Sequence, residues 1–169
     1  MSLNINGTRA GIDSPGMNRQ QGTPAKRTGD PNFLKSFRTL GDEKYEELSN
    51  GVKMAVLKEG FGEEAEPGMK ILVAYSGWLQ DGTRFDSSLK RSRPFEFTLG
   101  AGQVIKGWEE GIRGMKPGER RQLVIPPQMA YGNRRRGEIP GNSTLVFNVE
   151  AIEVIPPSQN DKGNMSVVA

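Results

Sequence analysis

The sequence of 169 residues contains no cysteine and no histidine. Without cysteine, the chain can form no disulfide framework, no thiolate nucleophile and no cysteine-based zinc site. Without histidine, it lacks the commonest acid–base group and the commonest metal ligand in proteins. We therefore expect a function that rests on shape, desolvation and hydrogen bonds, and that uses no metal and no other cofactor.

Long apolar runs are also missing, and the first sixteen residues (MSLNINGTRAGIDSPG) lack the apolar core of a signal peptide. We expect a soluble intracellular protein without a membrane partner. The cytoplasm is the expected compartment, with the nucleus as the alternative.

Positive charge is concentrated near the amino terminus. Residues 1–38 hold six Lys/Arg and two Asp/Glu, whereas residues 39–155 hold sixteen and seventeen. The basic character of the chain therefore belongs to its first segment, and the remainder is nearly balanced. A whole-chain pI of about 9.3 is for this reason only a weak indication of nucleic-acid binding, which we do not expect.

The composition divides the chain into three parts. Residues 1–40 form an N-terminal extension whose first 32 residues are too polar to offset the entropy of ordering, so we expect disorder when free. Residues 41–155 form the domain, and residues 156–169 a flexible tail. Within the extension, an apolar stripe is either a short helix that docks on a protein partner or a set of residues folded against the domain, which we favour. Its members are Phe33, Leu34, Phe37 and Leu40.

Strand and turn signals dominate the rest of the chain. Asn50-Gly51 and Asp81-Gly82 are typical of tight turns. Alternating or continuous apolar residues predict strands from Val52 to Val56 and at 71–75, 120–125 and 144–155. The spacing of Ile105, Trp108 and Ile112 predicts one short helix over residues 105–112. Many strands and one helix indicate an α+β fold.

A series of short motifs resembles the FKBP-type peptidyl-prolyl cis-trans isomerases, the immunophilins that bind macrolides. The resemblance runs from about residue 51 to residue 155 and implies an antiparallel half-barrel sheet wrapped around one short α-helix. The motifs are Tyr75-Ser76-Gly77-Trp78-Leu79, Phe85-Asp86-Ser87-Ser88, Pro94-Phe95-Glu96-Phe97, Val104-Ile105-Lys106-Gly107-Trp108-Glu109-Glu110-Gly111, Ala130-Tyr131-Gly132 and Leu145-Val146-Phe147.

The resemblance implies a rotamase that accelerates rotation about Xaa-Pro bonds of peptide or protein clients, assists folding as a chaperone or promotes conformational switching, and is inhibited by macrolides. Such a reaction breaks no covalent bond, so it needs no general base and the lack of histidine is no obstacle. The alternative is a non-catalytic FKBP-like binding module, anchored to a larger assembly through its basic N-terminal tail.

The resemblance also implies the site residues. Asp86, Trp108 and Tyr131 are the expected catalytic residues, with Trp108 at the pocket floor and the Tyr131 hydroxyl donating to a bound carbonyl. The backbone N–H of Ile105 is the expected second donor. The expected substrate-binding residues are Tyr75, Phe85, Arg91, Phe95, Gln103, Val104, Ile105, Ile139 and Phe147.

The loop after Tyr131 departs from the family pattern. It carries three consecutive arginines, Arg134 to Arg136, and Glu138 stands where an apolar residue is common. A solvated loop is the interpretation that we favour. Selection of acidic clients, helped by Lys90, Arg91 and Arg93, and contact with nucleic-acid phosphates are the alternatives.

Overall fold

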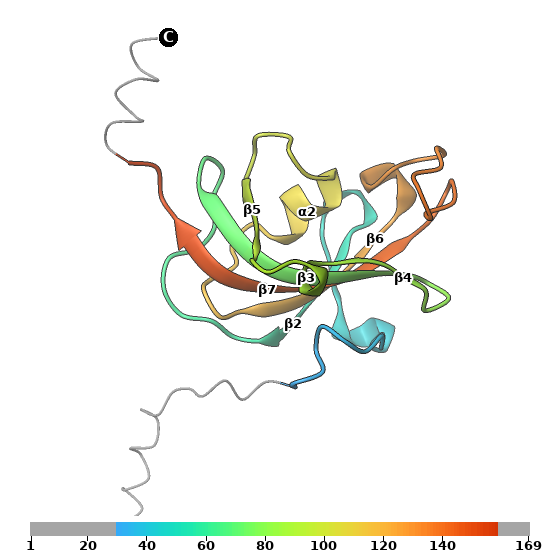
Figure 1. Ribbon diagram of the computed structural model, residues 1–169, viewed down its shortest axis with the longest axis horizontal. Coiled ribbons are helices and arrows are strands. Elements are labelled where there is room, and N and C mark those ends of the chain that lie inside the picture. The colour runs from blue at the N-terminus through green and yellow to red at the C-terminus, as the bar shows by residue number, and fades with distance from the viewer. Residues whose placement is uncertain (1–29, 159–169) are drawn as a thin grey trace, which may run out of the picture. The chain divides into compact units, whose positions relative to one another are not determined.

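Within residues 30–158, which are the residues that the computed structural model describes, seven strands form one antiparallel sheet in the order β1-β2-β6-β7-β3-β4, and β5 pairs with β3 (Figure 1). The predicted disordered segment (residues 1–32) and the predicted flexible tail (residues 156–169) fall mostly on residues 1–29 and 159–169, which lie outside this range. The strands are β1 (Glu46–Glu47), β2 (Lys53–Lys58), β3 (Lys70–Leu79), β4 (Arg84–Ser87), β5 (Phe95–Thr98), β6 (Arg120–Ile125) and β7 (Leu145–Ile155).

The long strand β3 organises the sheet. It pairs with β7 along its whole length, from Lys70 opposite Ile155 to Leu79 opposite Leu145. Its other edge is shared by two short strands, because β5 pairs with residues 70–73 and β4 with residues 76–78. The chain therefore leaves this edge after β4 and returns to it at β5, and the 3-10 turn η4 (Ser88–Lys90) lies in between.

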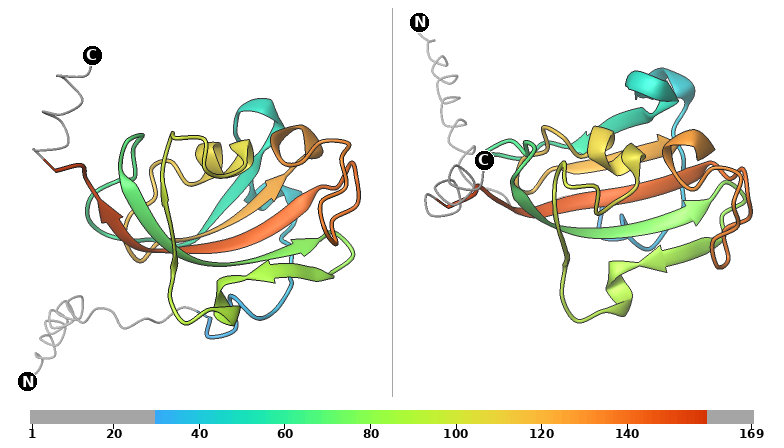
Figure 2. Two further views of the ribbon diagram at one scale, coloured as in Figure 1. Left: turned by 45° about the horizontal axis from the view of Figure 1, so that its top comes forward. Right: turned by 90° about the horizontal axis from the view of Figure 1, so that it is seen from above.

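Helix α2 (Lys106–Gly111) lies on the concave side of the sheet, and Figure 2 shows the strands curving around it. Two glycines let α2 approach β6 closely. A Cβ atom on Gly107 would lie 2.4 Å from Ile125, and one on Gly111 would lie 2.6 Å from Leu123. The helix is one residue shorter at each end than predicted, with Ile105 and Ile112 as its caps. No helix of residues 30–158 has the length and apolar character to cross a bilayer.

Alternate side chains of the strands fill the space between the sheet and α2. On β7, for example, Leu145, Phe147, Val149 and Ala151 all belong to this core. The α+β class predicted from the sequence is confirmed, because an antiparallel sheet curves round a short helix. The Asn50-Gly51 turn also forms, with Asn50 at φ 61° between β1 and β2.

Residues 32–40, here called the strap, lie on the face of the sheet opposite α2 (Figure 1). Their carbonyl groups accept hydrogen bonds from polar side chains of that face. Asn148 Nδ2 donates to the Phe33 carbonyl (2.6 Å), Ser76 Oγ to the Leu34 carbonyl (2.6 Å) and Gln122 Nε2 to the Arg38 carbonyl (2.8 Å). The strap thus satisfies side chains that would be costly to bury without partners.

Aromatic packing adds to these hydrogen bonds. Phe33 is buried under the Arg120 guanidinium, which lies 4.9 Å from the ring centroid. The ring centroids of Phe37 and Trp78 are 5.8 Å apart. Phe33 and Phe37 are therefore folded against the domain and do not form a free docking helix. The strap belongs to the compact unit that begins at Asn32.

Candidate active site

A cavity of about 250 Å³ opens beside α2, and eleven of the twelve predicted site residues line it. Strands β3, β4, β5 and β7, helix α2, the loop before α2, the residue after the η4 turn and the loop after β6 all contribute. The lining residues are Tyr75, Phe85, Asp86, Arg91, Phe95, Gln103, Val104, Ile105, Trp108, Tyr131 and Phe147. Residues far apart in the sequence thus meet at one place, as predicted.

Trp108 is held by four aromatic rings. Its indole makes edge-on contacts with Tyr75 (centroids 5.0 Å apart), Phe147 (5.4 Å) and Phe95 (6.0 Å). A fourth, tilted contact is with Phe97 at 5.7 Å. Edge-to-face pairs of this kind stabilise packing beyond their buried area. The indole is only 4 % exposed, and its N–H has no hydrogen-bond partner within the described part of the chain.

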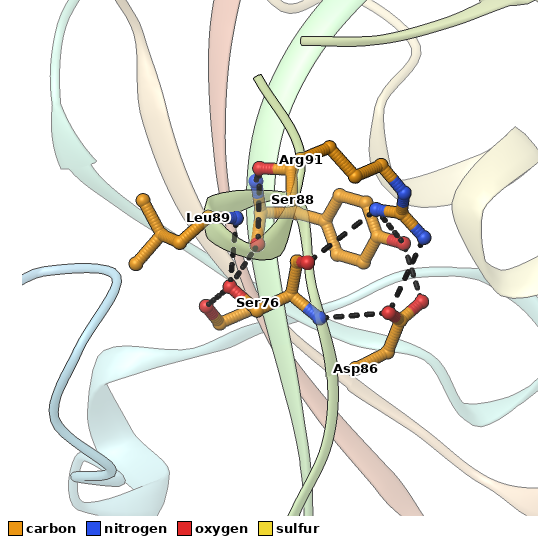
Figure 3. Close-up of polar contacts among 7 residues, drawn as sticks. Ser76, Asp86, Ser88, Leu89 and Arg91 are labelled. Carbon is orange, nitrogen blue, oxygen red and sulfur yellow. Dashed lines mark hydrogen bonds and ion pairs between the residues drawn. The ribbon is translucent and has the colours of Figure 1, made fainter. Parts of the chain in front are cut away.

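One wall of the cavity is built from Tyr75, Asp86 and Arg91. Figure 3 shows the side chain of Arg91 reaching the carboxylate of Asp86. The Tyr75 hydroxyl donates to Asp86 Oδ2 (2.5 Å), while Arg91 Nη2 lies 3.4 Å from Asp86 Oδ1. Asp86 Oδ1 also accepts from the backbone N–H of Ser87 (2.8 Å). These contacts fix the Tyr75 ring against Trp108.

Burial of the ring raises the pKa of Tyr75 to about 12, from an ordinary value of 10.0. The hydrogen bond to Asp86 acts in the same direction, whereas Arg91 opposes the shift. The same contact with Tyr75 is the main cause of a raised pKa for Arg91. The phenol of Tyr75 is therefore protonated throughout the physiological range.

The Tyr75→Phe variant tests this assignment. Because the pKa of Tyr75 is higher in the folded than in the unfolded chain, its contribution to stability is complete below about pH 10 and is lost as the pH rises towards about 12. We expect the free energy of unfolding of the wild type to fall over this interval more than that of the variant. Urea titrations at several alkaline pH values measure the difference, and parallel curves would disprove the assignment.

Serine side chains support this wall, and sequence reasoning assigned them no role. Ser88 Oγ accepts from the Tyr75 backbone N–H (2.9 Å), and the hydroxyls of Ser76 and Ser87 are 2.8 Å apart. Ser87 Oγ also accepts from the N–H of Leu89 (3.1 Å) at the start of η4. Figure 3 shows Ser76, Ser88 and Leu89 grouped beside Arg91 and Asp86. The preference of serine for capping short turns is the sequence signal that could have predicted the role of Ser87.

Tyr131 and Ile105 line the cavity as well. Tyr131 is half-buried, and its hydroxyl forms no hydrogen bond with another residue of the described range. The guanidinium carbon of Arg136 lies 4.9 Å from the centroid of its ring. Ile105 is the N-cap of α2, so its N–H precedes the helix and has no helical carbonyl to bind. Both groups are thus candidate donors to a ligand.

Ile139 is the exception among the predicted site residues. It does not line the cavity but is buried in the hydrophobic core, with 6 % exposure. Its backbone exchanges two hydrogen bonds of 2.8 Å with Arg136, which close a tight turn around Gly137. Ile139 therefore lies in the core and does not line the cavity with the other eleven residues.

The chemistry available in the cavity is that of an apolar aromatic pocket with a few polar groups on its walls. In the part of the chain that is described, no group of three or more His, Cys, Asp or Glu residues could hold a metal ion. A half-barrel sheet, a short central helix and an indole that lines the cavity define a class of prolyl-bond isomerases, which the sequence already resembles.

Comparisons with known proteins agree with this class. Residues 62–152 match the family model of the FKBP-type peptidyl-prolyl cis-trans isomerases. An FK506-binding protein of Neisseria meningitidis serogroup A is 57% identical over 99 residues, which cover 58% of this chain and 91% of that protein. FK506-binding protein 1 of Dictyostelium discoideum is 52% identical over 103 residues, covering 60% of this chain and 96% of the relative.

Solved structures show the same relationship. FkpA from Escherichia coli has a TM-score of 0.64 and 40% identity, and the match covers 69% of this chain and 54% of FkpA. AtFKBP13 has a TM-score of 0.61 and 38% identity, and the match covers 64% of this chain and 97% of AtFKBP13. The chain belongs to the FKBP-type peptidyl-prolyl cis-trans isomerase family. The predicted family, fold and enzymatic activity are confirmed.

Proposed function

We propose that the cavity beside α2 binds the proline ring of a client and lowers the barrier to rotation about the preceding peptide bond. The observation that carries this proposal is the placement of Trp108. Its indole is fixed by four aromatic rings next to the cavity, and eleven predicted site residues surround the same space. The rigid, apolar surface of the indole suits the five-membered ring of proline.

The environment favours a twisted amide over a planar one. The barrier to rotation is the loss of amide resonance, roughly 18–20 kcal/mol. The planar amide is more polar than the twisted amide, so transfer into an apolar cavity raises its free energy more than that of the transition state. No proton has to be transferred at any step.

The polar groups orient the client. In this proposal the Tyr131 hydroxyl and the Ile105 N–H donate hydrogen bonds to client carbonyls on either side of the rotating bond. Asp86 fixes Tyr75 through the 2.5 Å hydrogen bond, and its side chain, which is 36 % exposed, presents a carboxylate to the cavity. Because the client carbonyls are held, rotation about the peptide bond before the proline is the motion that the site permits.

The Tyr131→Phe variant tests the orienting hydrogen bond. We expect kcat/KM for a short neutral Xaa-Pro peptide to fall by about fivefold, because one hydrogen bond contributes roughly 1 kcal/mol. Exchange spectroscopy of the peptide's cis and trans signals measures the rate. Tyr45→Phe is the matched control, since the Tyr45 hydroxyl donates to Gln122 on the strap side of the sheet. Equal rates for the wild type and Tyr131→Phe would exclude the role.

We further propose protein clients and macrolide binding. The relatives in Neisseria meningitidis and Dictyostelium discoideum are named FK506-binding proteins, and the cavity of this chain has the aromatic lining that an apolar macrolide requires. FK506 should therefore suppress peptide isomerisation. Acceleration of a refolding reaction limited by prolyl isomerisation would support a role in protein folding.

A further inference from the structure

A second, larger groove adjoins the catalytic cavity. Its volume is about 520 Å³, and it shares Arg91, Phe95 and Gln103 with the cavity. The remaining lining residues are Arg93, Pro94, Glu96, Phe97 and Thr98. Since the two spaces share three walls, a peptide whose proline occupies the cavity can extend directly into the groove.

The groove runs along the free edge of β5. Among the residues that the structure describes, β5 pairs with β3 alone. The N–H of Thr98 points away from β3 and donates to Gln103 Oε1 (2.9 Å). Because backbone groups alternate in direction along a strand, those of Glu96 also point away from β3. The outward groups of Thr98 are already bonded, because its carbonyl accepts from the Ala101 N–H (3.3 Å). An extended peptide in the groove can therefore add to β5 through the backbone N–H and carbonyl of Glu96.

The charge of the groove is positive and local. The Glu96 carboxylate is paired with Lys70 Nζ at 3.1 Å, and Arg91 is paired with Asp86. Arg93 is exposed and forms no ion pair with any residue between 30 and 158. Residues 39–155 as a whole are nearly neutral, so this positive charge does not follow from the overall composition of the domain.

We propose that this groove binds an acidic stretch of the client beside its Xaa-Pro bond, with Arg93 facing a client carboxylate and the β5 edge holding the client backbone. The proposal rests on the proposed function, because it requires the proline to occupy the adjoining cavity. The groove selects among clients, and the aromatic cavity performs the isomerisation.

Matched peptides test the proposal in two series. Each series has the same neutral Xaa-Pro core, with two Glu, two Ala or two Lys residues placed before it in one series and after it in the other. We expect kcat/KM for the Glu peptide to exceed that for the Lys peptide by about fivefold in one series at low ionic strength. High salt should abolish the difference, because the charges are exposed. Exchange spectroscopy measures all peptides without a coupling protease.

Charge reversal locates the effect. Arg93→Glu should invert the order of the Glu and Lys peptides, whereas Arg135→Glu, a matched change in the arginine loop, should leave the order and ratio as in the wild type. Equal rates for all charged peptides, or an equal response of the peptide rates to both variants, would overturn the groove assignment. Turnover of the Ala peptide in the same experiment would still support the proposed function. A folded protein that turns over no peptide would overturn the proposed function itself. Stronger competition by a short single-stranded RNA than by a free acidic peptide would show a nucleic-acid groove instead.

Discussion

Replacing Trp108 with leucine should lower kcat/KM for a neutral Xaa-Pro peptide by about tenfold or more, which corresponds to roughly 1.4 kcal/mol of transition-state stabilisation. Leucine keeps an apolar side chain but removes the flat surface on which we place the proline ring. It also removes the contacts with Tyr75, Phe95, Phe97 and Phe147 that fix the cavity walls. Peptide exchange rates, measured where the variant is folded, give the effect.

The chain offers a matched control in its second tryptophan. Trp78 is 2 % exposed and packs against Phe37 of the strap, away from the cavity. Both Trp→Leu variants should lose about 2 kcal/mol of stability through the cavity left behind, but only Trp108→Leu should lose activity beyond twofold. An equal loss of activity in both variants would show that the effect of Trp108 is one of stability alone.

The Arg121→Met variant should lower the free energy of unfolding by about 3–5 kcal/mol, because it leaves a buried carboxylate without its partner. Arg121 Nε donates to Glu119 Oε2 at 2.7 Å, and the two side chains are 9 % and 4 % exposed. Arg121 Nη1 also donates to the carbonyls of Gly111 and Arg113, both at 2.8 Å. The pair thus anchors the carboxyl end of α2, and with it Trp108, to β6.

Chemical denaturation measures the loss for Arg121→Met, and Lys70→Met provides the comparison. The Lys70–Glu96 pair has a similar separation of 3.1 Å, but both side chains are about half exposed. Its removal should cost less than about 1 kcal/mol. Similar losses for the two variants would mean that burial does not determine the contribution of these ion pairs.

Local signals in the sequence predicted much of the fold. The Asn50-Gly51 turn, β6 and β7 follow from turn chemistry and strand patterns that act within a few residues. The helix followed from the spacing of Ile105, Trp108 and Ile112. Nine of the eleven cavity residues lie within the motifs of the resemblance, whereas Arg91 and Gln103 lie between motifs and were assigned from the resemblance as a whole.

Features that depend on long-range contacts were less predictable. The sequence favoured packing of the strap's apolar residues against the domain, but it did not indicate which face of the sheet they cover. The strap lies on the sheet because Asn148, Gln122 and Ser76 bind its carbonyls, and those residues are 42 to 115 positions away in the chain. The resemblance implied a wall position for Ile139, but this residue lies in the core, where its backbone forms a turn with Arg136. The groove beside β5 depends on how two loops meet, which no single motif encodes.

The cis–trans exchange rate of a neutral Xaa-Pro peptide, measured with wild-type protein in H₂O and in D₂O, tests most directly whether this site twists an amide without moving a proton. We expect the protein to accelerate exchange by the same factor in both solvents, since desolvation and orientation involve no transferred hydrogen. No acceleration by the folded protein, or acceleration that falls severalfold in D₂O, would show that the cavity works by another mechanism.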